Sequence, residues 1–317
     1  MARQVTLEES NLKWETFKGS IPNGAVSIYN DYENRTDYVA KYEDQPGFFC
    51  PDLDSYCHYS RAGKELRSST FEILVNKDDF ESLEWKGGSH GSVPANAVYA
   101  SHNERHVGKN QYGLGKVHAR YENFYHAWRG KEYEYKDYQV LTFNPDVTSE
   151  HICDVKYKTN PTIIKHPPEI LTKSKITNNS NQPVTQTVTL SYENKVEQRW
   201  DTSFSMKTGV TTRITAGIPS IASADVEFSV VTTLESTEGT THTKSTTHSV
   251  AVECKVPPKH DCSVSMVGYR YRADIPYTAR LKRTYRNGGT RSTSITGTYK
   301  GVSVGEVWTE VDPCQPL

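Results

Sequence analysis

The amino-acid sequence predicts an all-β protein. Its 317 residues include 20 Tyr but only 3 Met, and aromatic and β-branched residues favour strands. Ser and Thr alternate with Val, Leu and Ile over long stretches, which is the two-residue period of a strand, and no long stretch shows the 3.6-residue period of a helix. We expect an N-terminal tandem-repeat β module followed by an elongated antiparallel β domain.

Charge and apolar runs exclude several functions. The formal net charge is -1 and the isoelectric point is near 6.8. The chain therefore lacks the basic excess of nucleic-acid-binding proteins, and no nucleic acid is expected as a partner. Its apolar runs are far shorter than the roughly 18 residues of a membrane-spanning helix. No apolar signal segment is visible at the start of the sequence, so we expect a chain that is soluble before any action on a membrane.

An internal repeat fills the first part of the chain. The segment GSIPNGAV at 19–26 recurs as GSVPANAV at 91–98. Three further pairs of segments match in the same order, namely 39–41 with 107–109, 63–65 with 130–132, and 71–75 with 138–142. Two tandem β modules are therefore expected over about residues 14–143.

A composition shift near Asn144 predicts a domain boundary. Residues 171–250 contain 29 Ser or Thr and no Cys. These residues alternate with apolar ones, as in 185–192, which favours long polar-faced strands over a linker. We place the first domain at 1–144 and the second at 145–317.

The six cysteines permit three disulfides, and spacing alone leaves 15 connectivities open. Two short loops, each bracketed by a pair of cysteines, favour local pairs, which leaves one distant pair. The candidates are Cys50 with Cys57, Cys254 with Cys262, and Cys153 with Cys314. The alternative is six reduced thiols in a cytosolic protein, because no signal peptide is visible.

The segment 210–230 carries the functional hypothesis, because two arms alternate face by face. The even positions are apolar except for one Thr: Val210, Thr212, Ile214, Ala216, Ile218, Ala222, Ala224, Val226, Phe228 and Val230. The odd positions carry no apolar side chain apart from those of the turn: Thr211, Arg213, Thr215, Ser223, Asp225, Glu227 and Ser229. Transmembrane β-strands need about 9–11 residues and alternate in this way.

The predicted tip of this hairpin favours a membrane role. It reads Gly217 to Ile221 and is apolar, whereas a tight turn in a soluble hairpin favours Asn-Gly or Asp-Gly. A tip that crosses hydrocarbon first should be apolar. The alternative is a half-buried hairpin in a soluble antiparallel sheet, which alternates in the same way.

These residues carry a family resemblance. Residues 216–230 read AGIPSIASADVEFSV, and this stretch resembles the pre-stem region of aerolysin-type β-pore-forming proteins. The segments GSIPNGAV and GSVPANAV, each with GKE downstream, resemble the tandem DM-nine repeat module. The fusion of both modules is similar to the natterin and natterin-like family, and the resemblance covers nearly the whole chain.

The resemblance implies an aerolysin-like second domain and a pore-forming mechanism. The soluble chain would bind a cell-surface glycan or glycoprotein receptor, form a homo-oligomeric ring and insert one hairpin per subunit into a shared barrel in a lipid membrane. It would be secreted or released, act at target membranes, and need no catalytic residue, cofactor or metal. The even positions would face lipid and the odd positions would line the pore. One positive and two negative groups per subunit then predict a mild cation preference.

The glycan-binding residues implied by the resemblance are incomplete. Relatives of the DM-nine module include mannose-binding lectins that contact sugar through an acidic residue and a Lys. By position these become Asp31 and Lys116, while Asn103 takes the acidic position of the second repeat and Phe48 the Lys position of the first. Either Asp31 and Lys116 converge across the repeat interface, or sugar binding has changed or been lost, or both are surface charges without a ligand.

Two other functions stay open at this stage. The segment GGSHG at 87–91 matches the G-x-S-x-G pattern of serine hydrolases, and natterin relatives have been described as kininogen-cleaving. However, Ser89 precedes a repeat strand rather than the helix that a nucleophile elbow requires, so a glycine-rich link between repeats is the preferred interpretation. The other alternative is a lectin whose second domain never inserts.

Overall fold

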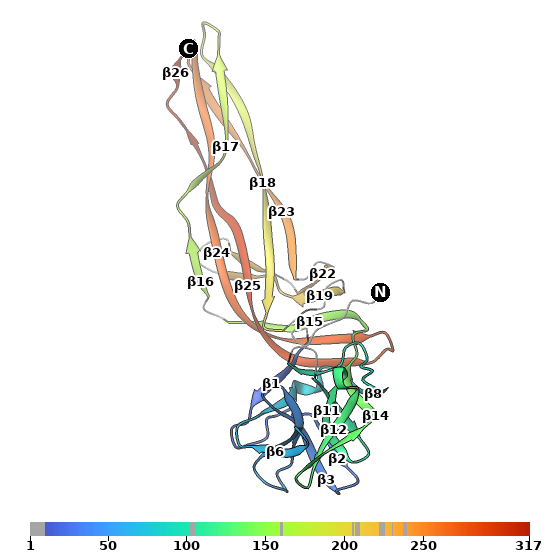
Figure 1. Ribbon diagram of the computed structural model, residues 1–317. Coiled ribbons are helices and arrows are strands. Elements are labelled where there is room, and N and C mark those ends of the chain that lie inside the picture. The colour runs from blue at the N-terminus through green and yellow to red at the C-terminus, as the bar shows by residue number, and fades with distance from the viewer. Residues whose placement is uncertain are drawn as a thin grey trace. The chain divides into compact units, whose positions relative to one another are not determined.

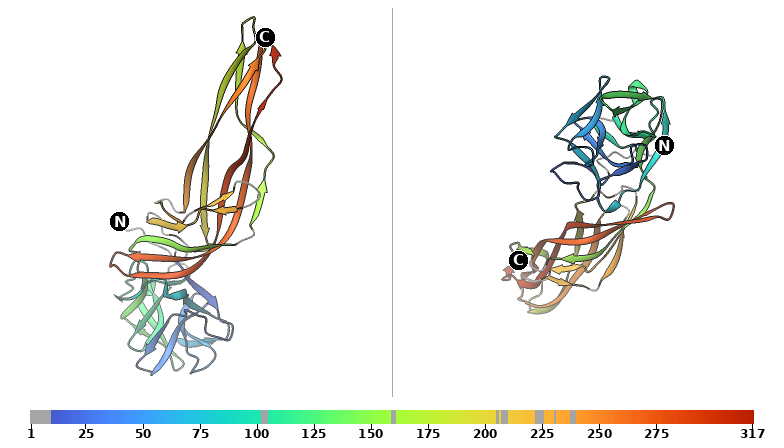
Figure 2. Two further views of the ribbon diagram at one scale, coloured as in Figure 1. Left: turned by 180° about the vertical axis from the view of Figure 1, so that it is seen from behind. Right: turned by 90° about the horizontal axis from the view of Figure 1, so that it is seen from below.

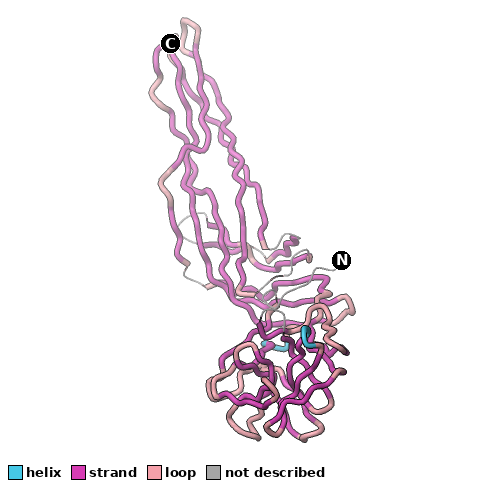
Figure 3. The backbone as a smooth tube through the Cα atoms, in the orientation of Figure 1, coloured by secondary structure: helices cyan, strands magenta, loops and turns pink. Residues whose placement is uncertain are grey.

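The computed structural model describes residues 10–101, 105–158, 161–204, 206, 210–221, 226–229, 231–236 and 240–317. Strands make up nearly all of its regular structure, with two short 3-10 helices, η2 (Lys77–Asp79) and η3 (Ala119–Tyr121) (Figures 1 and 3). This confirms the all-β prediction. Within the described ranges, no helix is long and apolar enough to cross a membrane.

The chain forms two compact units, described in turn. Unit 1 comprises Met1–Thr148, Phe204–Lys207 and Lys282–Thr293, and unit 2 comprises Ser149–Ser203, Thr208–Leu281 and Ser294–Leu317. The first division lies four residues beyond the predicted boundary. Composition did not indicate that Lys282–Thr293 belongs to unit 1, because this segment lies at the adjoining ends of two strands late in the sequence.

Unit 1 contains a 14-stranded sheet. From one end of the sheet the strands of the first repeat follow one another in the same order as their counterparts in the second repeat do from the other end. The order is β1-β7-β3-β4-β5-β6-β13-β12-β11-β10-β14-β8, with β2 on β3 and β9 on β10. The first seven strands are β1 (Leu12–Thr16), β2 (Ser27–Asn30), β3 (Arg35–Tyr42), β4 (Gln45–Phe49), β5 (Cys57–Arg61), β6 (Lys64–Ser68) and β7 (Glu72–Asn76). The next seven are β8 (Leu83–Ser89), β9 (Tyr99–Ser101), β10 (Arg105–Asn110), β11 (Gly113–His118), β12 (Asn123–Trp128), β13 (Lys131–Tyr135) and β14 (Asp137–Phe143). The sequence repeat is therefore also a repeat of strand order.

Two glycines show why the repeat keeps its sequence. Gly47 on β4 and Gly115 on β11 occupy equivalent positions. A Cβ on Gly47 would lie 2.0 Å from the His58 carbonyl oxygen, and one on Gly115 would lie 2.2 Å from the Tyr125 carbonyl oxygen. Since no side chain fits that distance, the close approach of backbone to backbone requires glycine in both repeats.

The two repeats share one apolar core. Phe48 and Leu74 from the first repeat pack in the same cluster as Leu114 and Leu141 from the second, and each is at most 2 % exposed. Full burial of such side chains stabilises a fold by about 1.5–3 kcal/mol each. The repeats therefore form one structural unit.

Unit 2 is built on long strands that run side by side along its length (Figures 1 and 2). Its main sheet has the order β22-β19-β15-β24-β25-β18-β23, and β16, β17 and β26 pair with β24. The longest strands are β18 (Val184–Thr202), β23 (Thr241–Val256), β24 (His260–Tyr285) and β25 (Thr290–Val311). The others are β15 (Val147–Tyr157), β16 (Thr162–Lys165), β17 (Glu169–Asn178), β19 (Thr211–Ala216), β20 (Pro219–Ile221), β21 (Val226–Phe228), β22 (Thr232–Ser236) and β26 (Gln315–Pro316).

The described part of the Ser- and Thr-rich segment is largely strand, as its alternation predicted. In β18, Leu190 and Trp200 are buried, whereas Thr189, Ser191 and Arg199 beside them are exposed. The Trp200 indole N–H donates to the Tyr157 hydroxyl at 2.9 Å, so even this buried ring has its polar atom satisfied.

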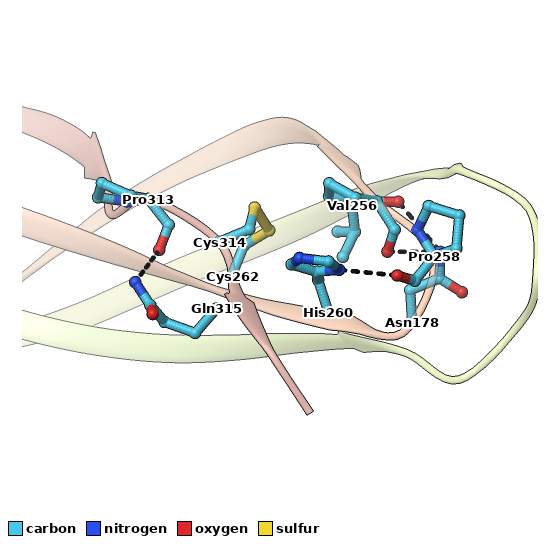
Figure 4. The surroundings of a disulfide bond; sticks show 9 residues. Asn178, Val256, Pro258, His260, Cys262, Pro313, Cys314 and Gln315 are labelled. Carbon is cyan, nitrogen blue, oxygen red and sulfur yellow. Dashed lines mark hydrogen bonds between the residues drawn. A yellow bond between two sulfur atoms is a disulfide. The ribbon is translucent and has the colours of Figure 1, made fainter.

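The predicted disulfide pairs are wrong, because Cys262 bonds to Cys314 (Figure 4). The tail reaches this position through β26, which pairs with the start of β24 at His260 and Asp261. Cys254 lies on β23, which pairs with β18 rather than with β24. Cys254 is a free thiol, and so is Cys153.

The first predicted pair fails because the two side chains lie on opposite faces of a sheet. Phe49 and Cys57 oppose each other in the β4–β5 ladder, and opposed residues share a face. Cys50, one residue further along, therefore lies on the other face. Cys57 packs in a cluster with Phe49, whereas Cys50 packs in the cluster around Phe48, and both are free buried thiols.

Candidate membrane-inserting hairpin and candidate glycan site

The candidate hairpin exists, but its turn is not where the sequence placed it. Strand β19 pairs with β22 and strand β20 pairs with β21, both antiparallel. Pro219–Ile221 is thus a strand rather than the tip, and residues 222–225, which connect β20 to β21, lie outside the described residues. Pro219 fits there because the first residue of a strand need not donate to the ladder. The hairpin therefore runs from 211 to 236 instead of 210 to 230.

A β-bulge changes the register partway along the hairpin. Ala216 opposes Thr232, whereas Pro219 opposes Phe228, so the second arm has one more residue than the first between these pairs. Beyond the bulge the Ser229 N–H donates to the Ile218 carbonyl at 3.1 Å. Because an extra residue reverses the facing of one strand relative to its partner, the two arms share one even–odd alternation only up to Ala216 in this state. Ala222, Ser223, Ala224, Asp225 and Val230 lie outside the described residues.

The first arm stores its apolar face against the body of unit 2. Thr212, Ile214 and Ala216 are 1 %, 0 % and 4 % exposed, whereas Arg213 between them is exposed. Strand β19 lies parallel to β15, where Ile214 opposes Ile152. Side chains that would face lipid are therefore buried in this state.

The docked position of β19 rests on a short ladder. Only four register pairs join β15 to β19, from Ser149↔Thr211 to Ile152↔Ile214. Among the described residues, the buried Thr212 hydroxyl has no hydrogen-bond partner. An unsatisfied buried hydroxyl destabilises its position by about 1–3 kcal/mol. Release of the strand from β15 therefore breaks few backbone hydrogen bonds.

The polar face of the hairpin contains two residues that the sequence analysis missed. The Arg213 Nε donates to Glu235 Oε1 at 2.6 Å, and the hydroxyls of Thr215 and Thr233 lie 2.8 Å apart. Glu235 and Thr233 belong to β22, beyond the predicted end at 230. Leu234, which opposes Ile214, continues the apolar alternation and could have revealed the longer arm.

Lys116, a predicted glycan residue, is used inside the fold. It is 5 % exposed. Its ammonium donates to Gln45 Oε1 at 2.9 Å and to the Ser60 carbonyl, and it lies 3.5 Å from the Glu132 carboxylate. Burial lowers the pKa of Lys116, and Glu132 opposes that shift.

Asp31 and Lys116 do not converge. Asp31 is exposed directly after β2 and lines a cleft of about 700 Å³, whereas Lys116 lines a separate cavity of about 250 Å³. Phe48, at the Lys position of the first repeat, is 2 % exposed and stacks on His58 with 5.1 Å between ring centroids. Asn103 lies outside the described residues. The structure therefore contradicts a joint site for Asp31 and Lys116.

Ser89 does not occupy a nucleophile elbow. It ends strand β8, opposite Asp137, and a turn follows in which the Ser92 N–H donates to the Ser89 carbonyl at 2.9 Å. The described chain then continues into β9 rather than into a helix. Across the described ranges, no group of three or more His, Cys, Asp or Glu could hold a metal ion.

Comparisons with solved structures return neighbours of low sequence identity. A lamprey immune protein aligns over 95 % of this chain and 98 % of its own, with 17 % identity and a TM-score of 0.45. Parasporin-2 from Bacillus thuringiensis aligns over 52 % of this chain and 74 % of its own, with 19 % identity and a TM-score of 0.36.

Sequence comparisons identify the family. A family model described as the DM9 repeat matches residues 39–106. Natterin-3 of Thalassophryne nattereri is 48 % identical over 98 % of this chain and 85 % of its own length. Natterin-1 of the same species is 44 % identical over 98 % of this chain and 88 % of its own length. With identity of this level over nearly its full length, the chain belongs to the natterin family.

Proposed function

We propose that this chain is a pore-forming protein. It binds a cell-surface glycan or glycoprotein receptor through unit 1, assembles with further copies into a ring, and inserts the hairpin 211–236 into the lipid membrane of a target cell, to which it is secreted or released. The observation that carries this proposal is the hairpin itself, whose first arm buries an apolar face and exposes a charged one.

The length of the hairpin supports insertion. Each arm spans eleven residues, from 211 to 221 and from 226 to 236, and a transmembrane β-strand needs about 9–11 residues. The register beyond the bulge must shift by one residue during insertion for each arm to present one continuous apolar face. In the part of the hairpin formed by β19 and β22, Ile214 and Leu234 then face lipid while Arg213 and Glu235 face water.

Insertion requires several copies. A single hairpin in lipid leaves two edges of unpaired backbone groups, and each unsatisfied group costs several kcal/mol. Closure of a barrel by neighbouring hairpins removes every edge. Assembly must therefore precede or accompany insertion.

A reversible crosslink tests the proposal. Ser149 and Thr211 oppose each other between β15 and β19, and neighbouring strands lie about 4.8 Å apart, within the reach of a disulfide. The variant Ser149→Cys/Thr211→Cys, made with Cys153→Ser to avoid mispairing, should not release calcein from vesicles of red-cell lipids and glycoproteins when oxidised. Reduction should restore release.

The controls are the two single-cysteine variants under the same reductant, because reduction can also open the Cys262–Cys314 bond. Release at the wild-type rate from the oxidised double variant would overturn the proposal. Binding to these vesicles without release by the wild type would instead identify a non-inserting lectin.

A further inference from the structure

Two equivalent lysines in the repeats of unit 1 have different surroundings. Lys41 on β3 and Lys109 on β10 each place their ammonium over a tryptophan ring, Trp14 at 5.1 Å and Trp85 at 4.8 Å. The tryptophans also occupy equivalent positions, opposite Leu74 and Leu141. The two halves of unit 1 therefore allow an internal comparison.

In the first half the lysine is closed off by protein partners. The Lys41 ammonium donates to the Ala100 carbonyl at 3.0 Å and pairs with the Glu72 carboxylate at 3.0 Å, and Lys41 is 9 % exposed. Glu72 stands directly opposite Lys41 in the β3–β7 ladder. Two of the three N–H donors of this buried ammonium therefore already have protein acceptors.

In the second half, the Lys109 ammonium lacks the protein partners that Lys41 has. Gln139 stands opposite Lys109, where the first repeat has Glu72. Within the described ranges, no protein oxygen accepts a hydrogen bond from the Lys109 ammonium, and Lys109 lines the 700 Å³ cleft with Asp31. Burial lowers the pKa of Lys109, and the Asp31 carboxylate opposes that shift.

The cleft combines aromatic faces with charged and amide groups from three segments, 28–31, 109–113 and 135–139. The rings of Tyr112 and Tyr135 lie 5.2 Å apart. Asp31 and Asp137 supply two carboxylates, and Lys109 and Lys136 supply two ammonium groups. The charges of the lining therefore balance.

This chemistry suits a neutral sugar. Carboxylates accept hydrogen bonds from pairs of hydroxyls, an ammonium donates to hydroxyl or ring oxygens, and a tyrosine ring covers the C–H face of a pyranose. A polyanionic glycan would meet both carboxylates without a compensating basic excess. In the separate cavity that Lys116 lines, the Lys116 ammonium already has Gln45, Ser60 and Glu132 as partners.

We propose that the cleft around Lys109 and Asp31 is the glycan site of this chain and that it takes a neutral hexose. The proposal rests on the receptor-binding part of the proposed function. It places recognition away from Lys116, in a cleft to which the first repeat contributes Asp31 and the second contributes Lys109.

Calorimetric titration of the full chain tests the proposal, with methyl α-D-mannopyranoside, methyl β-D-galactopyranoside and N-acetylneuraminic acid as probes. We expect one of the two neutral glycosides to bind at one site per chain, and Lys109→Met and Asp31→Asn each to weaken it at least about tenfold. The exposed Lys131→Met variant should bind as the wild type does. Thermal melting confirms that each variant is folded.

Three results would overturn the proposal. They are unchanged affinity in Lys109→Met, a preference for N-acetylneuraminic acid, and loss of binding in Lys116→Gln with Lys109→Met unaffected. Absence of binding by any probe would overturn this site and the glycan-binding role together. Calcein release from vesicles of lipid alone then distinguishes the outcomes, because release there would leave the pore-forming part of the proposed function standing.

Discussion

At the residue scale, the repeats exchange the positions of a cation and an aromatic ring. In the first repeat Phe48 stacks on the opposed His58, and in the second Lys116 lies over the opposed Tyr125 at 5.3 Å. Each cation meets the glutamate of the matching GKE segment, Glu65 for His58 and Glu132 for Lys116. The departure of Phe48 from the lysine of the lectin pattern therefore has a structural cause that a single position in the sequence could not reveal.

His58 is held between two carboxylates. Its Nδ1 lies 2.8 Å from Glu65 Oε1 and its Nε2 lies 3.0 Å from Asp54 Oδ1, and its side chain is 5 % exposed. Burial opposes its charge, but the hydrogen bonds to Glu65 and Asp54 raise the pKa of His58 above 6.5. Hydrogen bonds with His58 also help to lower the pKa values of Asp54 and Glu65 against the effect of burial.

These shifts predict a pH-dependent contribution to stability. A raised histidine pKa stabilises the fold fully below the unfolded value of 6.5, and this contribution is lost as pH rises through the folded value. The lowered carboxylate values add stability that is lost only in acid. We therefore expect His58→Gln to lose about 1–3 kcal/mol of unfolding free energy near pH 5.5 and less near pH 8.5.

Urea unfolding of the wild type and His58→Gln at both pH values measures this difference. The exposed His166→Gln variant is the control, and it should match the wild type at both. An equal loss for His58→Gln at the two pH values would show that the His58 charge contributes nothing.

At the scale of elements, the alternation of apolar and polar residues predicted the strands, because a strand's two faces depend on residues close together in the sequence. Residues 211–216 form a strand with one buried and one exposed face because each apolar residue there alternates with a polar one. The turn could not be predicted, because Gly217 and Pro219 are typical turn residues yet lie at a bulge and a strand start. The tail disulfide could not be predicted either, since Cys262 and Cys314 are 52 residues apart and meet only through the pairing of β26 with β24.

The longer hairpin alters the expected charge of the pore wall. In the proposed pore, the Glu235 carboxylate beside Arg213 would cancel the positive group that the sequence analysis counted, and the carboxylates expected to line the pore at 225 and 227 would make the lumen negative. In Glu235→Gln the Arg213 charge is uncompensated and the cation preference should decrease. Reversal potentials of wild-type and variant pores across a KCl gradient measure the change.

The matched control for this experiment is Glu253→Gln on β23, outside the hairpin, which should leave the reversal potential unchanged. An unchanged reversal potential in Glu235→Gln would contradict the proposal that Arg213 and Glu235 face the lumen of the pore.

At the scale of the whole molecule, unit 1 is completed by a segment from late in the sequence. The Arg283 guanidinium lies 2.9 Å from Glu81 Oε1, and both side chains are 0 % exposed. The same carboxylate accepts hydrogen bonds from the Asn11 backbone N–H and side-chain amide, and Arg283 stacks over Phe80 at 4.5 Å. Composition placed the domain boundary near 144 because the later segments of unit 1, Phe204–Lys207 and Lys282–Thr293, are short, and so few residues change no compositional average.

The buried pair predicts that a residue of the long β24 strand controls the stability of the N-terminal repeats. Arg283→Met leaves the Glu81 carboxylate buried beside Asn11 without its counter-charge, and removal of one partner of a buried ion pair costs about 3–5 kcal/mol. Hydrogen exchange should therefore accelerate in β7 and in the loop 76–81. Exchange in β18 and β23 of unit 2 should not change.

Two variants separate charge from packing in this prediction. In Glu81→Leu/Arg283→Met both charges are replaced by apolar groups, and much of the lost stability should return because no buried charge remains. In Lys86→Met, an exposed pair with Glu84 is lost, with both side chains nearly half exposed, and the effect should stay below about 1 kcal/mol. If Arg283→Met exchanges as slowly as the wild type in β7 and at residues 77–81, the charge of Arg283 does not stabilise unit 1.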